Sequence, residues 1–321
     1  MKAARINEIK NNMTAFTNTT FTRDELLEEM IKLQNEMATI TFGEDAEGKR
    51  FYEIARHYSE VNATKNHIAD ELVEKVGKKC NEISNLIRAD ISGRKGEGKA
   101  FSRLQYLLSQ HGLRKNIEIS NGDKKTEIDA LVVTEKAAFI IEVKNTKRDI
   151  FIDAEGQYYR TGEFLKWDSN IGAKLNLREA FVREAAEKAG IKNLRIVKVV
   201  VFTDNRIRVQ NKCLDIRTCF LNQLTSVIDT FRGNKVLSIN DIESLLNVVD
   251  EMETKSSYEV KFDVESFKTE FAEMVATLEG YTDEEAKVTI LDWQRTKKVI
   301  SNFFNKRVGI AMILSVIAGL I

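Results

Sequence analysis

Three charged side chains interrupt two apolar runs in residues 127–145, EIDALVVTEKAAFIIEVKN. Asp129 stands in the first run, and Glu142 and Lys144 stand in the second. Charged side chains are rarely buried unless they are paired or bind a metal. The polar break TEKA between the runs predicts a β-hairpin with Glu135–Lys136 as its two-residue turn, although glycine-type residues are more usual there.

This turn would place Asp129 directly opposite Glu142 on the neighbouring strand. Because side chains alternate along a strand, Glu142 and Lys144 share one face. Apolar residues occur on both faces, with Ile128, Ala130 and Val132 on one, and Leu131, Val133 and Ile140 on the other. We therefore expect a sheet that is buried on both sides and brings two carboxylates and an ammonium group together at one end.

Two opposed carboxylates repel each other, and both stay ionised when a divalent cation lies between them. Oxygen ligands favour Mg²⁺ or Mn²⁺. This set predicts phosphodiester hydrolysis, in which the metal activates water and neutralises the phosphate while Lys144 orients the nucleophile. The alternative is a set of buried ion pairs between Lys144 and Asp129 or Glu142, which leaves one carboxylate unpaired.

A third carboxylate, Glu97, is spaced from Phe101, Leu104 and Leu108 as residues on one helical face are. We expect this helix to begin in the glycine-rich stretch GRKGEGK and to pack on the sheet. Glu97 then points inward near the helix start. An inward glutamate is costly unless it binds something.

These residues, in this order, resemble the PD-(D/E)xK nuclease superfamily, and in detail the nuclease-related domain (NERD) group. GRKGEGKAF resembles its Gly-Glu helix, and EIDALVV its IDH-type strand, with Ala130 where histidine is usual. FIIEVKN is close to its IEVKN signature, including Asn145, and IVKVVVFTD resembles its later strand. The resemblance covers roughly residues 91–250.

The resemblance implies a restriction-endonuclease-like α/β core, a mixed central sheet flanked by helices. It also implies that Glu97, Asp129 and Glu142 hold Mg²⁺ or Mn²⁺ with help from the Val143 carbonyl, and that Lys144 is the catalytic lysine. The family often has an Asn-Pro…Gln pattern before the second helix. Here LNLREAF keeps Asn176 and replaces the proline and glutamine, which affects substrate details rather than the metal residues.

Net charge is zero, so any contact with nucleic acid must come from a local basic cluster rather than from the whole surface. Basic residues around the predicted site are Arg94, Lys95, Lys99, Arg103, Lys124, Lys125, Lys147 and Arg148. Arg94 and Lys95 are best placed, because a helix N-terminus also favours anions. Any single one of these residues is more commonly just a solvated side chain, and no base-stacking aromatic motif predicts sequence specificity.

Helical periodicity flanks this domain on both sides. Residues 1–90 predict a helical hairpin or coiled-coil arm with a capping pattern at Thr22 and a long helix over residues 51–91; the arm is expected to make a homo-oligomer. Residues 251–321 predict a C-terminal helical region. The absence of proline among 321 residues favours long helices.

The chain ends in an apolar tail, residues 308–321, that is shorter than the roughly 20 residues of a membrane-spanning helix. Three interpretations stay open: a buried or oligomer-forming helix, a minimal membrane anchor, or part of a longer span. Three cysteines without metal-ligand spacing indicate reduced thiols, and with no apolar leader segment they favour a cytoplasmic protein.

The sequence thus predicts a metal-dependent nuclease acting on DNA, with RNA left open, in DNA processing or in defence against foreign DNA. The alternative is a catalytically silent nuclease-like protein that binds nucleic acid or a partner and assembles an oligomer or a membrane-linked scaffold.

Overall fold

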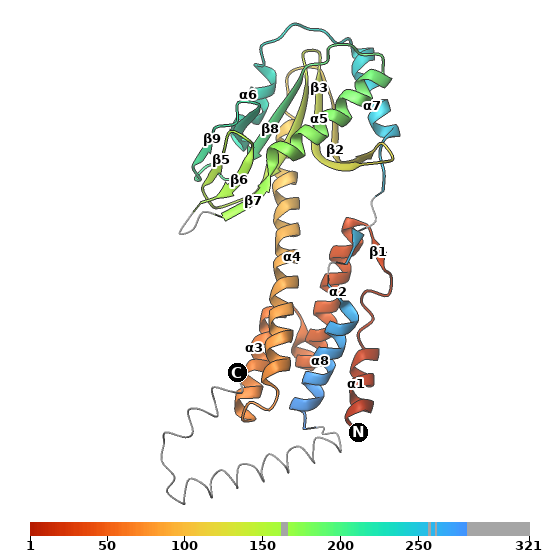
Figure 1. The fold of residues 1–321 in the computed structure, drawn as a ribbon, viewed down its shortest axis with the longest axis vertical. Coiled ribbons are helices and arrows are strands. Elements are labelled where there is room, and N and C mark those ends of the chain that lie inside the picture. Colours follow the sequence, from red (N-terminus) through yellow and green to blue (C-terminus); the bar gives the residue numbers. More distant parts are fainter. Residues whose placement is uncertain (162–165, 256–257, 261, 281–321) are drawn as a thin grey trace, which may run out of the picture. The chain divides into compact units, whose positions relative to one another are not determined.

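The computed structural model describes residues 1–161, 166–255, 258–260 and 262–280, which fall in two compact units (Figure 1). A helical unit comprises residues 1–19 and 28–84 and the described residues between 260 and 280. An α/β unit comprises residues 20–27 and 85–259. Two of the four unit boundaries fall inside helices, one in α2 (Arg23–Phe42) and one in α4 (Asp70–Leu104).

The helical unit buries apolar stripes that the sequence predicts. Its remaining elements are α1 (Lys2–Asn11), the short 3-10 helix η1 (Gly43–Ala46), α3 (Phe51–Thr64) and α8 (Val264–Leu278). The capping pattern at Thr22 is confirmed, since its hydroxyl accepts from the Glu25 N–H at 3.3 Å and its own N–H donates to the Glu25 carboxylate at 2.7 Å. Helix α8, whose buried residues include Phe267 and Phe271, belongs to the same unit as the N-terminal helices.

The predicted single helix over residues 51–91 is wrong. Helix α3 ends at Thr64, and Asn66 and His67 adopt the left-handed conformation with φ of 58° and 59° before α4 begins at Asp70. The Asn62 side chain stabilises this break by accepting from the Ala69 N–H at 3.0 Å and donating to the Asp70 carboxylate at 2.6 Å. The local polar bonds of an asparagine compete here with helix continuation.

The α/β unit is built on a five-stranded mixed sheet in the order β10-β8-β4-β3-β2. The strands are β2 (His111–Ser120), β3 (Lys125–Thr134), β4 (Ala138–Lys144), β8 (Ile196–Phe202) and β10 (Ile216–Phe220). Strands β2, β3 and β4 pair antiparallel, whereas β4, β8 and β10 pair parallel. This arrangement confirms the predicted fold class.

Helices cover both faces of this sheet, as the apolar character of both faces predicts. Helices α5 (Ile171–Lys188) and α7 (Ile239–Glu251) share one buried cluster with Leu131, Val133 and Ile140. The end of α4 and helix α6 (Leu224–Asp229) share the other with Val132, Phe139 and Ile141. Charged side chains of α4 and α5 therefore approach the sheet from opposite faces.

The β3–β4 hairpin has the predicted register. Ala130 pairs with Ile141 and Val133 with Ala138, and the Thr134 N–H donates to the Ala137 carbonyl at 2.9 Å across the turn. One face assignment is wrong: Ile128 belongs to the cluster of the α5 face rather than lying with Ala130. The β2–β3 ladder is interrupted beside it, where Asn116 has a φ of 49°.

A second, four-stranded sheet in the order β7-β6-β5-β9 was not predicted. Its strands are β5 (Ile150–Ile152), β6 (Gln157–Arg160), β7 (Lys166–Asn170) and β9 (Val209–Asn211). The unit also contains a two-stranded ladder of β1 (Thr20–Phe21) and β11 (Tyr258–Glu259), and the 3-10 helix η2 (Leu221–Gln223) after β10. The shortest strands have three residues or fewer, too few for an alternation pattern to stand out in the sequence.

The predicted helix start in the glycine-rich stretch is also wrong. Helix α4 runs without a break from Asp70 to Leu104, so Gly93, Gly96 and Gly98 lie inside it. A Cβ at Gly96 would come 2.8 Å from the Asn145 Cβ, so this glycine permits close packing of helix against strand. Leu108 lies beyond the helix and is 91% exposed, so it does not extend the inward face of Glu97.

Within the part of the chain that the structure describes, no helix is both long enough and apolar enough to cross a bilayer. The apolar tail of residues 308–321 lies outside the described residues, and so does the predicted helix that precedes it.

Candidate active site

Asp129 lies in the middle of β3, and Glu142 lies two residues before the end of β4. Each is one position beyond the paired residues Ala130 and Ile141, so the predicted register places the two acids opposite each other. The Asp129 carboxylate accepts the Val143 N–H at 2.7 Å, which holds the acid against the neighbouring strand. Asp129 is also the residue at the interruption of the β2–β3 ladder. Its carboxylate therefore takes the place of a strand partner and turns toward Glu142.

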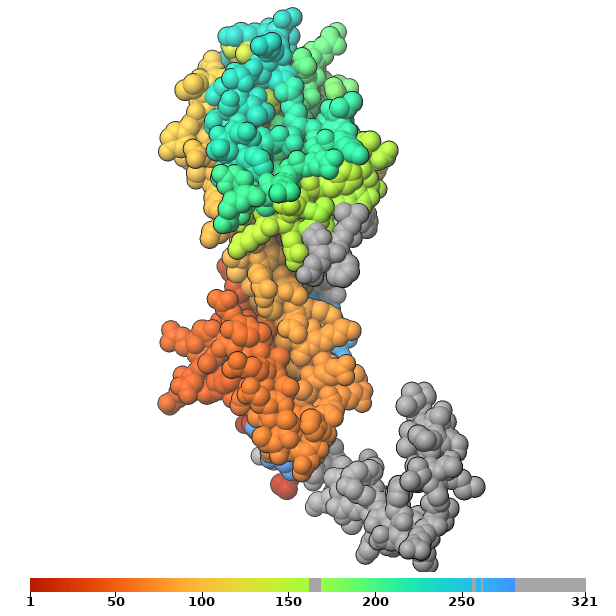
Figure 2. All heavy atoms as spheres, turned by 90° about the vertical axis from the view of Figure 1, so that its left-hand side faces the viewer, coloured from red at the N-terminus to blue at the C-terminus, as the bar shows by residue number. Residues whose placement is uncertain are grey.

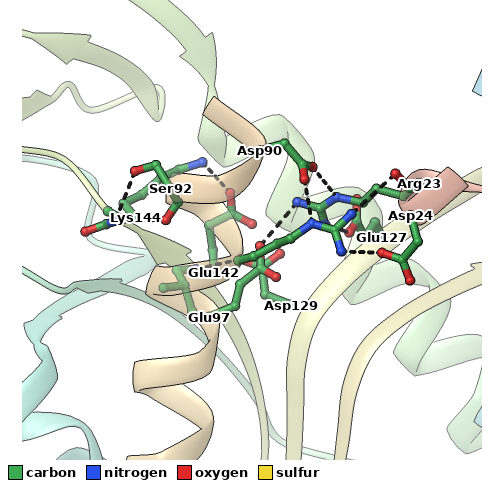
Figure 3. A network of polar contacts seen from close by, with 12 residues as sticks. Arg23, Asp24, Asp90, Ser92, Glu97, Glu127, Asp129, Glu142 and Lys144 are labelled. Carbon is green, nitrogen blue, oxygen red and sulfur yellow. Dashed lines mark hydrogen bonds and ion pairs between the residues drawn. The ribbon is translucent and has the colours of Figure 1, made fainter. Parts of the chain in front are cut away.

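Lys144 contacts the Glu142 carboxylate directly, with Nζ 2.5 Å from Oε1 (Figure 3). Glu142 is only 5% exposed. The Lys144 ammonium also lies over the ring of Tyr158 on β6, 5.9 Å from its centroid. The second sheet thus contributes an aromatic wall beside the lysine, which sequence reasoning missed.

Arg178 on α5 is the cation that joins the two carboxylates. One terminal nitrogen of its guanidinium donates to Glu142, and the other lies 3.8 Å from Asp129 Oδ1. Arg178 is buried, and its Nε has no hydrogen-bond partner among the described residues. The sequence alternative of buried ion pairs lacked a partner for one carboxylate, and Arg178 supplies it.

Sequence reasoning did not select Arg178, although it stands in LNLREAF, where the chain departs from the family pattern. Helix α5 is capped by Asn170, whose side chain accepts the Ala173 N–H at 2.7 Å. Asn176, the residue kept from that pattern, accepts from the buried Lys198 ammonium on β8 at 2.6 Å. These contacts tie α5 to the sheet and direct Arg178 toward the carboxylates.

Burial and neighbouring charges shift the pKa values of Asp129 and Glu142 in opposite directions. Burial, and then repulsion by Glu142, raises the pKa of Asp129. Burial also opposes ionisation of Glu142, but the charges of Lys144 and Arg178 outweigh it and lower its pKa. The pair therefore keeps one firmly ionised carboxylate and one carboxyl that holds its proton unusually well.

Glu97 approaches from α4, on the other face of the sheet, and has a different cation. Arg23, at the start of α2, contacts three carboxylates: its Nε lies 2.9 Å from Asp90, its Nη1 2.7 Å from Glu127, and its Nη2 3.5 Å from Glu97 (Figure 3). The contact to Glu97 is the longest of the three. Burial raises the pKa of Glu97, and the charge of Arg23 partly opposes this.

Arg23 belongs to the segment Thr20–Leu27, which is part of the α/β unit although it precedes the rest of that unit by more than fifty residues. Strand β1 ties this segment to β11. A cavity of about 400 Å³ lies here, lined by residues that include Thr22, Glu97 and Glu127. The sequence carried no signal for this placement, because neither spacing nor periodicity links Arg23 to Glu97.

The donor atoms fit a hard divalent cation at Asp129 and Glu142. Both side chains offer carboxylate oxygens, and their mutual repulsion would be relieved by a cation. In the described residues, no group of three or more histidine, cysteine, aspartate or glutamate side chains is arranged to hold one metal ion. The assignment of Glu97, with the Val143 carbonyl, to the same metal as this pair stays a prediction.

Some residues predicted to contact nucleic acid form ion pairs within the protein, and others do not. Arg94 forms ion pairs with Asp24 and Asp90, and it lies far inside α4, so the helix N-terminus argument for Arg94 and Lys95 is wrong. Lys125 lies 3.7 Å from the Glu118 carboxylate. The other basic residues named around the site are exposed and have no ion pair among the described residues: Lys95, Lys99, Arg103, Lys124, Lys147 and Arg148.

Part of the α/β unit matches a known protein family. Residues 92–203 match the model of the nuclease-related domain family, NERD. This stretch runs from α4 through the hairpin and α5 to the end of β8, so it contains Glu97, Asp129, Glu142, Lys144 and Arg178. No curated protein and no solved structure matches the chain.

Proposed function

Because residues 92–203 form a nuclease-related domain, we propose that the chain is a metal-dependent nuclease that hydrolyses phosphodiester bonds of DNA. The observation that carries this proposal is the group formed by the buried Glu142 and the partly buried Asp129 and Lys144. Two acids and a lysine on adjacent strands offer metal ligands and a positive charge to one phosphate. DNA processing or defence against foreign DNA would use such an activity.

In this proposal Asp129 and Glu142, with the Val143 carbonyl and Glu97, hold Mg²⁺ or Mn²⁺, which supplies a water of lowered pKa and neutralises phosphate charge. Lys144 remains an ammonium group, because the charge of Glu142 outweighs the burial that opposes protonation and its pKa is raised. It therefore donates hydrogen bonds to the phosphate or nucleophile and does not act as a base.

Arg178 gives the site a positive charge that the sequence hypothesis did not include. In the structure, Arg178 and Lys144 balance the two carboxylates. A cation that binds Asp129 and Glu142 would compete with the guanidinium for the same oxygens. A guanidinium also binds phosphate in a bidentate manner, so Arg178 has a second ligand available at a nuclease site.

The test is cleavage by the purified full-length chain of linear and circular DNA, single- and double-stranded, with Mg²⁺, Mn²⁺ or EDTA. Asp129→Asn and Lys144→Met should each lower the rate at least a hundredfold, while circular dichroism shows a folded chain. Asp250→Asn, which removes a surface carboxylate paired with Arg114, is the matched control and should retain activity. A wild-type chain that leaves DNA and RNA intact with both metals contradicts the proposal.

A second candidate function is a catalytically silent nuclease-like protein that binds nucleic acid or a partner. The observation in its favour is that Arg178 and Lys144 already neutralise Asp129 and Glu142. Calorimetric titration with Mn²⁺ separates the two functions: the nuclease should bind the ion and Glu142→Gln should abolish binding, whereas the silent protein should bind none.

The assembly part of that alternative concerns the N-terminal helices and the tail of residues 308–321. A chain that stops before Arg307 tests it by light scattering and vesicle flotation. Loss of an oligomer or of vesicle binding, with DNA binding retained, would assign the tail to assembly or location. No change in either measurement would remove the main support for a membrane-linked scaffold.

A further inference from the structure

The cations nearest the carboxylates of the candidate site are engaged with acids of the protein. Arg94 is paired with Asp24 and Asp90, and Lys144 and Arg178 are paired with the two central carboxylates. In the last two turns of α4, the cations Lys99 and Arg103 are exposed and have no ion pair within the part of the chain that the structure describes. They lie one helical turn apart, so their side chains point the same way from the helix.

A groove of about 420 Å³ lies beside these two cations. Its lining consists of Lys99, Ser102, Arg103, Tyr106 and Leu221, so no carboxylate contributes to it. Tyr106 follows the end of α4 and is 71% exposed. Figure 2 shows the gold segment around the end of α4 at the surface, close to the green-cyan segment of β10 and α6. We call this surface the Tyr106 groove.

One lining residue of the Tyr106 groove, Leu221, lies at the same end of the sheet as Lys144 of the candidate site. Lys144, Phe202 and Phe220 are paired in one row across the parallel strands β4, β8 and β10. Leu221, which lines the groove, directly follows this row. Because neighbouring strands are about 4.8 Å apart, the ends of β4 and β10 are separated by about 10 Å. A nucleic-acid strand of a few nucleotides could span that distance.

We propose that the Tyr106 groove binds a nucleotide of single-stranded nucleic acid next to the cleaved bond, a role that rests on the proposed nuclease function. The Tyr106 ring stacks on an unpaired base, and Lys99 and Arg103 contact the adjoining phosphates. Every base has an aromatic face, so this contact tolerates any sequence. A base inside a duplex is already stacked on its neighbours, so the groove favours unpaired strands.

The test is fluorescence anisotropy of a labelled single-stranded DNA oligonucleotide with the full-length chain in EDTA, which prevents metal-dependent cleavage. Tyr106→Ala should weaken binding about tenfold, as expected for loss of one stacked base, and Tyr106→Phe should retain it. Tyr52→Ala is the matched control, since Tyr52 is 50% exposed on α3 of the helical unit. It should leave binding unchanged.

Salt dependence tests the two cations separately. The Lys99→Gln and Arg103→Gln variants should each lower the slope of log affinity against log salt by about 0.7, the value for one phosphate contact on a single strand. Arg56→Gln, which removes an exposed arginine of the helical unit, should leave the slope unchanged. Duplex DNA of the same sequence should show a smaller loss with Tyr106→Ala than the single strand does.

Three results would contradict nucleotide binding in the Tyr106 groove. The first is wild-type affinity for single-stranded DNA in Tyr106→Ala, and the second is an equal loss of affinity in Tyr52→Ala. The third is that the wild-type chain binds neither single-stranded DNA nor single-stranded RNA. Failure of the nuclease proposal gives a different pattern. A chain that never cleaves DNA, but loses single-strand binding in Tyr106→Ala and keeps it in Asp129→Asn, supports the groove and rejects catalysis.

Discussion

Replacement of Asp129 by asparagine should make the α/β unit more stable at neutral and alkaline pH than the wild type. Asparagine keeps an oxygen to accept the Val143 N–H, which Asp129 accepts at 2.7 Å, but removes the charge beside Glu142. Burial, followed by repulsion from Glu142, raises the pKa of Asp129 from its ordinary 3.8 to about 7. The folded chain therefore holds a proton that the unfolded chain releases.

The sign and size of the effect follow from this difference in bound protons. Because the folded state binds more protons than the unfolded state, wild-type stability falls as pH rises from about 4 to about 7. The loss is about 1.4 kcal/mol per pH unit, so about 2 kcal/mol is lost between pH 5.5 and 7. The Asp129→Asn variant has no such proton to lose, so its stability relative to the wild type should rise by about 2 kcal/mol between pH 5.5 and 7.

Urea unfolding in EDTA at several pH values from 5.5 to 8 measures the difference. In thermal unfolding, 2 kcal/mol corresponds to roughly 4–8 °C for a unit of this size. Glu142→Gln is the companion variant within the same site. Despite burial, Lys144 and Arg178 lower the pKa of Glu142, so its stabilising charge is complete above the unfolded pKa and is lost only in acid. Glu142→Gln also removes the repulsion that raises the pKa of Asp129, so it should destabilise the chain by an amount that shrinks as pH rises from 5.5 to 8.

The reasoning would be refuted if the stability difference between Asp129→Asn and the wild type did not change between pH 5.5 and 8. A difference that moved in favour of the wild type as pH rises would be a stronger contradiction. It would mean that Arg178 stabilises the ionised form of Asp129 more than burial and Glu142 oppose it.

Three further predictions concern the scaffold. Gly96→Ala should lower the free energy of unfolding by about 1–3 kcal/mol, because its Cβ would come 2.8 Å from the Asn145 Cβ. Gly98→Ala has open space around the new Cβ and should raise the free energy of unfolding by roughly 0.5–1 kcal/mol. Thermal unfolding compares the two variants. Ser238→Ala should lose about 1 kcal/mol in urea unfolding, since its side chain caps α7. Arg23→Gln should lose about 1–3 kcal/mol, because it leaves three carboxylates facing one another, and added salt should reduce this loss.

The central hairpin could be predicted because its information is local. Two alternating apolar runs and a two-residue break determine which residues pair, so Asp129 and Glu142 meet and Lys144 shares the face of Glu142. The capping pattern at Thr22 is likewise a local signal. Short motifs such as FIIEVKN are local as well, and they carried the resemblance to the nuclease-related domain and the fold class that it implies.

The glycine-rich stretch shows where local signals mislead. Three glycines within six residues indicated a helix boundary by intrinsic propensity, yet α4 continues through them. A glycine costs a helix about 1 kcal/mol, and close packing of Gly96 on Asn145 can offset such a cost. Propensity is a weak guide wherever tertiary contacts favour the opposite conformation.

Packing of the helices and strands determines which cation each acid contacts. Arg178 reaches Asp129 and Glu142 because α5 covers that face of the sheet, and Arg23 reaches Glu97 because β1 joins β11 in the α/β unit. These contacts link residues 36 to 74 positions apart. Over such separations a charge has no spacing or period to mark its partner, so the sequence could specify the acids while only the folded chain specifies the cations that neutralise them.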